Sequence, residues 1–292
     1  MEFFDNGWRR RIKARLRQAL GPWAKHVQYY SQYPRQLVMP DIDVLTTTER
    51  GLLMACSHEN YIEREIMTTG RFEADSTAVV EREVTPGQLV FDVGSNIGYY
   101  TMLLADLVGP TGAVHAFEPT AWAYQRSLRN LLMNPRLLDV PVAAHQLGLL
   151  ARAQEFVSAI ESRFSAKVLA HSQPERMRFT TIDAYCADRD ITHIDFMKID
   201  VDGHDVGVLR GAERTFAAHR PTLLCELCDR VLAPNGDSVA TYVAWLADHG
   251  YHEGDVIDGP MRGRRRLAEL AAPGLRPDDY GWSVNVLIKP AS

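Results

Sequence analysis

Short apolar runs alternate with helical patterns along most of this 292-residue chain. The clearest unit starts with the apolar run Leu89–Phe91, continues through a glycine-rich turn at 94–98 into a helical segment at 99–107, and ends with a second apolar run at 113–117. This order of strand, glycine turn, helix and strand predicts the first half of a nucleoside-binding α/β sheet.

The remainder of the chain continues the alternation of strand and helix. Further strands are predicted at 142–150, 155–160, 178–182, 194–199, 222–225 and 282–288. Helices are predicted at 121–134, 183–187, 206–216 and 239–250, the last one capped by Ser238. Short apolar strands separated by helices indicate a mostly parallel sheet with helices on both faces.

Residues 1–75 are predicted to form an N-terminal helical extension, and residues 76–292 the sheet domain. Within residues 7–25, tryptophan and aliphatic positions recur at helical spacing between arginines and lysines. We favour a helix that packs on its own body or on a second subunit of a homo-oligomer over one that lies on an anionic membrane surface. Thr46–Glu49 predicts a helix start, and 59–66 and 77–83 predict two more helical segments.

Composition narrows the class of protein. The net charge is −5, but residues 1–40 carry +6, so the rest of the chain carries −11. That acidic remainder argues against nucleic acid as a partner of the sheet domain. No apolar run approaches the ~20 residues of a membrane span, the N-terminus does not resemble a signal peptide, and four cysteines are too few for a disulfide scaffold. We therefore expect a cytoplasmic protein.

The glycine turn indicates which nucleoside is bound. It reads Asp92-x-Gly94-x-x-x-Gly98 and lacks the middle glycine that lets a dinucleotide pyrophosphate approach the backbone. Asp92 beside the turn would repel a phosphate and suits an ammonium group instead. Glu118, at the end of the second strand, is placed to accept hydrogen bonds from two ribose hydroxyls. These features favour S-adenosylmethionine over a nicotinamide dinucleotide.

Three motifs together carry a family resemblance. Val90–Thr101 (VFDVGSNIGYYT), Ala116–Pro119 (AFEP) and Asp195–Glu213, which contains the block DFMKIDVDGHD, resemble the FkbM-type S-adenosylmethionine-dependent methyltransferases, and Pro221–Glu226 (PTLLCE) completes the pattern. The similarity covers about residues 70–230. The departures are mild: Ser95 stands where alanine is common, and two aspartates, at 202 and 205, stand where glutamate is common.

The resemblance implies a class I methyltransferase fold, which is Rossmann-like, with a seven-stranded sheet whose last strand is antiparallel. It also implies O-methylation of a saccharide or natural-product hydroxyl. The cofactor-binding residues expected from the turn and the resemblance are Asp92, Gly94, Ser95, Asn96, Gly98 and Glu118. Phe72 and Glu73, in a segment that lies over the cofactor in the family, are further candidates.

The block after the strand at 194–199 supplies the candidate catalytic residues. Ligands bind at the carboxyl ends of the strands in open α/β sheets, so Asp200, Asp202 and His204 are expected beside the methyl group. Either His204 or Asp202 acts as a general base, or Asp200 and Glu226 hold Mg²⁺ or a similar ion that acidifies the acceptor hydroxyl. Both mechanisms remain open from the sequence, which also leaves the acceptor unidentified.

Two other classes of protein compete with the methyltransferase. A nicotinamide-dependent oxidoreductase also binds ribose through a carboxylate at a strand end, and a non-catalytic interaction protein could retain a vestigial pocket. The C-x-x-C spacing of Cys225 and Cys228 lies on a buried strand without a partner pair, which argues against zinc. The arginines at 262–266 are predicted to lie in a solvated loop.

Overall fold

The structure is a computed structural model, and it describes residues 43–58, 60–158, 175–259, 261–272 and 283–291. The chain divides into two compact units, Met1–Val44 and Leu45–Ser292. Residues 45–75 therefore belong to the same unit as the sheet, whereas the predicted amphipathic helix at 7–25 lies outside the described residues. Among the helices that the structure describes, none is both long and apolar enough to cross a bilayer.

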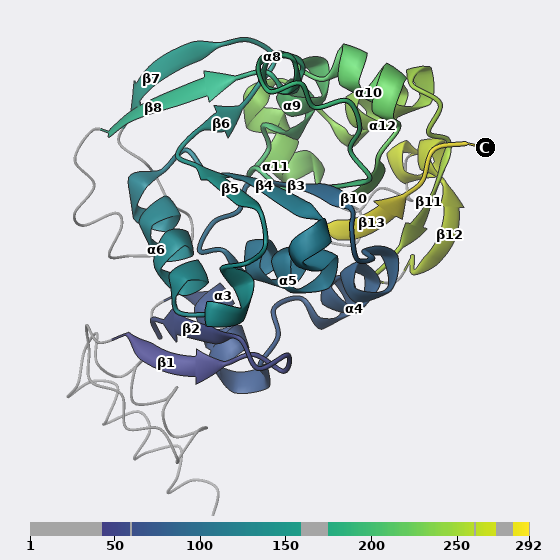
Figure 1. Cartoon of the computed structure of the whole chain (residues 1–292). Coiled ribbons are helices and arrows are strands. Elements are labelled where there is room, and N and C mark those ends of the chain that lie inside the picture. The colour runs from purple at the N-terminus through teal and green to yellow at the C-terminus, as the bar shows by residue number, and fades with distance from the viewer. Residues whose placement is uncertain (1–42, 59, 159–174, 260, 273–282, 292) are drawn as a thin grey trace, which may run out of the picture. The chain divides into compact units, whose positions relative to one another are not determined.

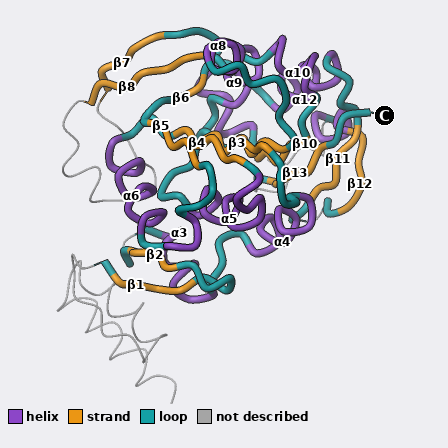
Figure 2. Tube along the Cα trace, viewed as in Figure 1, coloured by secondary structure: helices purple, strands orange, loops and turns teal. Residues whose placement is uncertain are grey.

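An eight-stranded sheet forms the centre of the second unit (Figures 1 and 2). From edge to edge its strands are β12 (Gly263–Arg266), β11 (Glu253–Val256), β13 (Val284–Ile288), β10 (Thr222–Leu227), β9 (Phe196–Ile199), β3 (Leu89–Val93), β4 (Ala113–Phe117) and β5 (Val142–His145). The strands from β10 to β5 are parallel to their neighbours. β13 is antiparallel to both β10 and β11, which confirms the predicted antiparallel last strand.

The sheet has one strand more than predicted. β12 pairs with β11 in antiparallel register and occupies the edge of the sheet, so the predicted loop at 262–266 is wrong. Arg264 suits a strand here because its partners lie across the pair: it contacts Glu253 at 3.1 Å and Asp255 at 3.7 Å. Cross-strand pairs of opposite charge stabilise neighbouring strands. A run of charged residues without alternating apolar positions gives no sign of such pairing in the sequence.

Helices cover both faces of the sheet. They are α3 (Tyr61–Thr69), α4 (Ala74–Glu83), α5 (Tyr99–Val108), α6 (Ala121–Leu132), α8 (Ile182–Asp188), α9 (Asp205–Arg210), α10 (Glu213–His219), α11 (Asp229–Leu232) and α12 (Val239–Asp248), with short 3₁₀ segments at Gly109–Thr111, Pro135–Leu137, Ala233–Asn235 and Leu267–Ala271. Two smaller sheets flank them, β1 (Val44–Thr47) with β2 (Leu53–Cys56), and β6 (Gly148–Leu149), β8 (Glu175–Thr180) and β7 (Gln154–Ser158).

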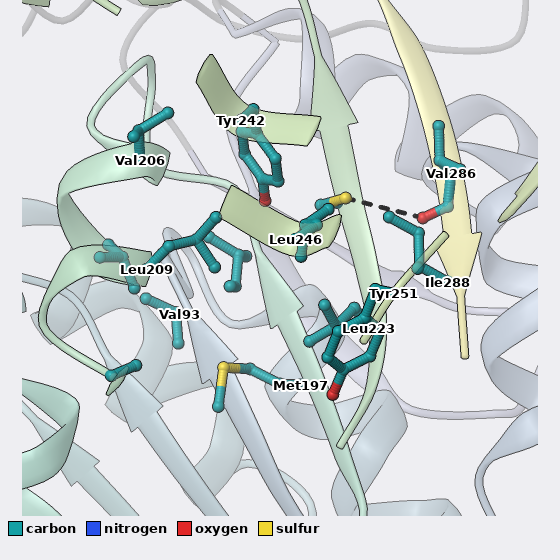
Figure 3. Packing of buried hydrophobic residues seen from close by; sticks show 14 of the residues in the cluster. Val93, Met197, Val206, Leu209, Leu223, Tyr242, Leu246, Tyr251, Val286 and Ile288 are labelled. Carbon is teal, nitrogen blue, oxygen red and sulfur yellow. Dashed lines mark hydrogen bonds between the residues drawn. The ribbon is translucent and has the colours of Figure 1, made fainter. Parts of the chain in front are cut away.

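The core has two halves because successive strand residues point to opposite faces. Phe91 and Met197 pack with α8, α9, α10 and α12 on one face, while Val90 and Phe196 pack with α3, α4 and α5 on the other. Figure 3 shows part of the first half, in which Met197 and Val93 lie below Leu209 and Leu246. The short, fully buried strands thus explain the continuous apolar runs of the sequence.

The predicted helix start at Thr46–Glu49 is wrong, because this segment is the β1–β2 hairpin. Thr48 caps the turn of the hairpin instead of a helix: its hydroxyl accepts from the backbone N–H of Leu52 at 3.1 Å, and its own N–H donates to the Leu52 carbonyl at 2.9 Å. The side chain of Asn134 then binds both the N–H and the carbonyl of Leu53, at 2.8 and 2.9 Å. These long-range contacts outweigh the local capping pattern.

The predicted helix at 206–216 is two helices, α9 and α10, separated at Gly211 and Ala212. A Cβ at Gly211 would lie 2.2 Å from the carbonyl oxygen of Leu150. The predicted run at 142–150 is likewise divided between β5 and β6, which belong to different sheets. The other predicted helices and strands are present in the described residues with ends shifted by a few positions.

Replacing Ser238 with alanine should lower the free energy of unfolding by about 1 kcal/mol, the usual loss for an N-cap. Ser238 forms a capping box at the start of α12: its hydroxyl accepts from the Thr241 N–H at 3.1 Å, and the Thr241 hydroxyl accepts from the Ser238 N–H at 2.8 Å. Urea unfolding measures the change. Ser238→Asp, which keeps an acceptor oxygen, should lose much less, and an equal loss in both variants would argue against the capping role.

Candidate active site

A pocket of about 700 Å³ opens at the carboxyl ends of β3, β4, β9 and β10. This is the edge of a parallel sheet where ligands bind. Of the predicted site residues, the pocket wall contains Phe72, Glu73, Gly94, Ser95, Asn96, Glu118, Asp200, Asp202, His204 and Glu226. The structure thus brings together residues that the sequence spreads over more than 150 positions.

The glycine turn forms the floor between β3 and α5. The backbone N–H groups of Gly94 and Ser95 both donate to the Phe117 carbonyl, at 3.0 and 2.9 Å, which ties the turn to β4. Gly94 has φ +88°, and a Cβ there would lie 1.9 Å from the carbonyl oxygen of Asp200. Glycine is therefore required for the close approach of this turn to the end of β9.

Glu118 lies at the end of β4 beside the turn. One carboxylate oxygen accepts from the Asn96 N–H at 3.1 Å, and the other accepts from the N–H and the hydroxyl of Thr120 at 2.9 and 2.6 Å. Burial raises the pKa of Glu118, and the hydrogen bonds from Thr120 and Asn96 oppose that rise. The carboxylate is held in a fixed orientation while it faces the pocket.

Asp92 and Gly98 support the turn from behind and are not part of the pocket wall. The Thr101 hydroxyl donates to Asp92 Oδ2 at 2.6 Å, whereas Asp92 Oδ1 has no hydrogen-bond partner among the described residues. Burial raises the pKa of Asp92, and Lys198 opposes the rise. Gly98, with φ +89°, leaves room for Ser127, whose Oγ would lie 2.5 Å from a Cβ at that position.

Lys198, which is buried, forms an ion pair with the partly exposed Asp200 at the end of β9. The ammonium nitrogen lies 2.8 Å from Asp200 Oδ2 and 4.8 Å from the centre of the Tyr100 ring. Only 5% of Lys198 is exposed. Lys198 thus supplies a positive charge to a pocket wall that is rich in carboxylates.

Asp202 and His204 lie in a tight turn between β9 and α9. Asp202 has φ +50° and Gly203 φ +91°, and a Cβ at Gly203 would lie 2.0 Å from the Val231 carbonyl oxygen. Both side chains are exposed at the pocket. Partial desolvation lowers the pKa of His204, so its imidazole is neutral at pH 7 and able to accept a proton.

Glu226, at the end of β10, shares the pocket with Asp200. Burial and the nearby Asp200 carboxylate raise the pKa of Glu226 to about 7, although a hydrogen bond from Ser283 opposes the rise. Asp200 and Glu226 are also the two candidate metal ligands, and that assignment stays a prediction. Asp200 is paired with an ammonium group, and within the described ranges no three His, Cys, Asp or Glu side chains are arranged to hold a metal ion.

Several pocket residues had no signal in the sequence. Tyr61 and Trp122 come from the first turns of α3 and α6, and Met177 and Phe179 come from β8. They lie outside the motifs, and only the tertiary fold brings them to the pocket. Burial raises the pKa of Tyr61, and Glu73, Asp200, Glu226 and Asp202 raise it further, so its hydroxyl faces the carboxylates of the wall.

A buried ion pair anchors α3 beside the pocket. The Glu63 carboxylate, whose side chain is fully buried, accepts from Arg126 of α6 at 2.5 Å and from the backbone N–H of Ser57. Arg126 also lies 5.0 Å from the centre of the Trp122 ring and donates to the Ala55 carbonyl at 3.1 Å. The pair thereby fixes the helices that carry Tyr61 and Trp122.

Parts of the chain are similar to known methyltransferases. Over 37 residues the chain is 60% identical to the 31-O-demethyl-FK506 methyltransferase FkbM of Streptomyces tacrolimicus, a match that spans 13% of this chain and 14% of that protein. Among solved structures, the methyltransferase FkbM from Methylobacillus flagellatus KT is 18% identical, with a TM-score of 0.39 over 69% of this chain and 43% of its own. A SAM-dependent methyltransferase from Aquifex aeolicus is 14% identical, with a TM-score of 0.40 over 74% and 89%.

The family of this chain is assigned from a family model that matches more than half of its length. The methyltransferase FkbM domain matches residues 92–253, which is more than half of the chain. This range contains the glycine turn, Glu118, the Lys198–Asp200 pair, His204 and Glu226, which the fold gathers into one pocket. The chain is a class I methyltransferase in its fold, and it belongs to the FkbM methyltransferase family.

Proposed function

We propose that this protein transfers a methyl group from S-adenosylmethionine to a hydroxyl group of a saccharide or natural-product acceptor. One observation carries the proposal: a single pocket joins the glycine turn and Glu118 to Asp200, Asp202 and His204. The first group of residues suits a nucleoside, and the second offers a proton acceptor at the same sheet edge. Bound S-adenosylmethionine supplies an electrophilic methyl group on a positively charged sulfur.

The residues of the pocket fit S-adenosylmethionine better than a dinucleotide. Glu118, held by Asn96 and Thr120, presents a carboxylate to a ribose diol. The pocket wall holds more negative than positive side chains: Glu73, Glu118, Asp200, Asp202 and Glu226 against Arg230 and Lys198, the latter paired with Asp200. A donor with ammonium and sulfonium groups is attracted by such a wall, whereas a pyrophosphate is repelled.

The acceptor chemistry rests on His204 and Asp202. His204 is exposed to the pocket and neutral at pH 7, so it suits removal of the hydroxyl proton as the methyl group is transferred. Asp202 offers a second acceptor two residues away. Holding the hydroxyl in line with the methyl group supplies much of the remaining catalysis. The acidic wall also favours a small uncharged acceptor over nucleic acid, whose phosphates it would repel.

Isothermal titration calorimetry with S-adenosylmethionine, S-adenosylhomocysteine and NADH tests the donor. We expect the first two to bind and NADH not to bind; binding of NADH alone would instead support a nicotinamide-dependent oxidoreductase. Cell extracts incubated with labelled S-adenosylmethionine and analysed by mass spectrometry then identify the acceptor. Label gained by oxygen of a small hydroxylated molecule supports the proposal, and label gained by nitrogen or by nucleic acid contradicts it.

A further inference from the structure

The turn between α3 and α4 carries a carboxylate into the pocket in an unusual backbone conformation. Glu73 has φ +46°, in the left-handed region that favours glycine, and it occupies the N-cap position of α4 without a side-chain capping bond. Its carboxylate lines the pocket instead of closing the helix end. Strained residues of this kind persist where the surrounding structure holds them, often at ligand sites.

The surroundings hold this turn firmly. The backbone N–H of Glu73 donates to Glu65 Oε1 at 3.0 Å, and the Thr77 hydroxyl donates to the Phe72 carbonyl at 2.6 Å. The Phe72 ring packs edge-on against Tyr99 and Tyr100, with centroids 6.2 and 6.3 Å apart. These contacts fix the direction of the Glu73 side chain before any ligand arrives.

The charge around Glu73 is predominantly negative. The Tyr100 hydroxyl donates to Glu73 Oε2 at 3.0 Å. The titratable groups that face Glu73 are Asp200 and Lys198 of β9, Glu226 of β10, Tyr61 and Glu65 of α3, and Tyr100 of α5. Lys198, the cation of this set, already pairs with Asp200. Burial and the Asp200 carboxylate therefore raise the pKa of Glu73 to about 7, although Lys198 opposes the rise.

Glu73 and Glu118 face different parts of the pocket. Glu118 is hydrogen-bonded to Asn96 and Thr120 at the end of β4. Glu73 is hydrogen-bonded to Tyr100 in the first turn of α5, beyond the glycine turn. A donor whose ribose lies at Glu118 and whose tail follows the glycine turn therefore brings its amino-acid end to Glu73.

We propose that Glu73 binds the α-ammonium group of S-adenosylmethionine and releases its carboxyl proton to solvent when the donor binds. This inference rests on the function proposed above, and it assigns to Glu73 a proton-linked role in donor binding. The positive ammonium stabilises the carboxylate form. The carboxylic acid loses one proton to the solvent, and the ammonium group keeps its own charge and protons.

Because donor binding is linked to proton release from Glu73, donor affinity should change with pH in a definite direction. Only the ionised form of Glu73 pairs with the ammonium group, so donor affinity rises as the pH increases towards about 7 and then levels off. Below that value the dissociation constant should rise about tenfold for each pH unit. S-adenosylhomocysteine has the same ammonium group without the sulfonium charge, so it should show the same dependence.

The test is calorimetric titration of the full-length protein with each of these two ligands at pH 6, 7 and 8, in two buffers of different ionisation enthalpy. At pH 7 we expect Glu73 to contribute about half a proton to the release for either ligand, because about half of its carboxyls are protonated at a pH equal to their pKa. Glu226, whose pKa is also about 7, adds its own contribution. Glu73→Gln should therefore lower the release at pH 7 by about half a proton, and should weaken binding at pH 8 by about 10- to 100-fold. Glu155→Gln, at an exposed position of β7 outside the pocket, is the matched control and should behave as the native protein.

The outcomes separate this inference from the proposed function. If neither ligand binds the native protein at any pH, the methyltransferase function itself is contradicted. If both bind without proton release, or if Glu73→Gln releases the same number of protons, the donor site stands and the role of Glu73 is wrong. Release with S-adenosylmethionine alone would place Glu73 at the sulfonium and overturn its assignment to the ammonium. Thermal unfolding of the variant shows whether it remains folded.

Discussion

Gly94→Ala should abolish donor binding and lower the free energy of unfolding by roughly 3 kcal/mol or more. The new Cβ would lie 1.9 Å from the Asp200 carbonyl oxygen and 2.9 Å from its carbonyl carbon. The neighbouring atoms are backbone, so no side chain can rotate away. Relief requires the glycine turn and the end of β9 to separate, which moves the donor-binding turn away from the catalytic residues. Urea unfolding and calorimetry with S-adenosylmethionine measure the two effects.

Gly236→Ala is a control that separates the effect of the steric clash at residue 94 from the effect of its left-handed backbone conformation. Gly236 has φ +78°, close to the +88° of Gly94, but no atom lies within 4 Å of a Cβ built there. Gly236→Ala should therefore lose only about 1 kcal/mol, the contribution of the left-handed conformation. If the two variants lose the same amount, the contact between the turn and β9 does not constrain residue 94, and the tight approach seen here is not essential.

His204→Ala should reduce turnover by roughly 10²- to 10⁴-fold and leave donor affinity unchanged. In the proposed mechanism the imidazole accepts the proton of the acceptor hydroxyl, whereas donor binding depends on the glycine turn and Glu118. Turnover is measured with the acceptor identified by labelling, at saturating donor so that Glu73 does not contribute to the pH profile. His252→Ala, at an exposed position outside the pocket, is the control.

The pH dependence of turnover is an independent test of His204 as the general base. Desolvation lowers the pKa of His204 below its ordinary value of about 6.5. A base must be deprotonated to act, so turnover should rise with pH below 6.5, level off above it, and lose this rise in His204→Ala. Near-normal turnover in His204→Ala, with a large loss in Asp202→Asn, would assign the base role to Asp202 instead.

The parts of the fold that the sequence predicted are those with strong local patterns. Buried parallel strands such as β3 and β9 are short continuous apolar runs, and helices such as α12 begin with a capping residue and end at a glycine. The glycine turn and Glu118 were equally visible, because a turn of this kind needs particular residues at fixed spacing.

The elements that the sequence did not predict depend on distant partners. β11 contains only Glu253, Gly254, Asp255 and Val256, and it becomes a strand because β13 and β12 pair with it on either side. The β1–β2 hairpin is fixed by Asn134, about 80 residues away. Tyr61 reaches the pocket only because α3 packs beside it. No residue spacing in the sequence predicts that packing.

The anchoring of α3 has a consequence for how this protein can be engineered. Glu63 and Ile66 hold the helix through a buried ion pair and the core, while Tyr61, which is 44% exposed, faces the pocket two residues earlier. Because the residue that faces the pocket and the residues that anchor the helix are different, the side chain at position 61 can change with little loss of folding free energy. A library that reshapes the pocket wall should therefore begin at Tyr61 and leave Glu63 and Arg126 intact.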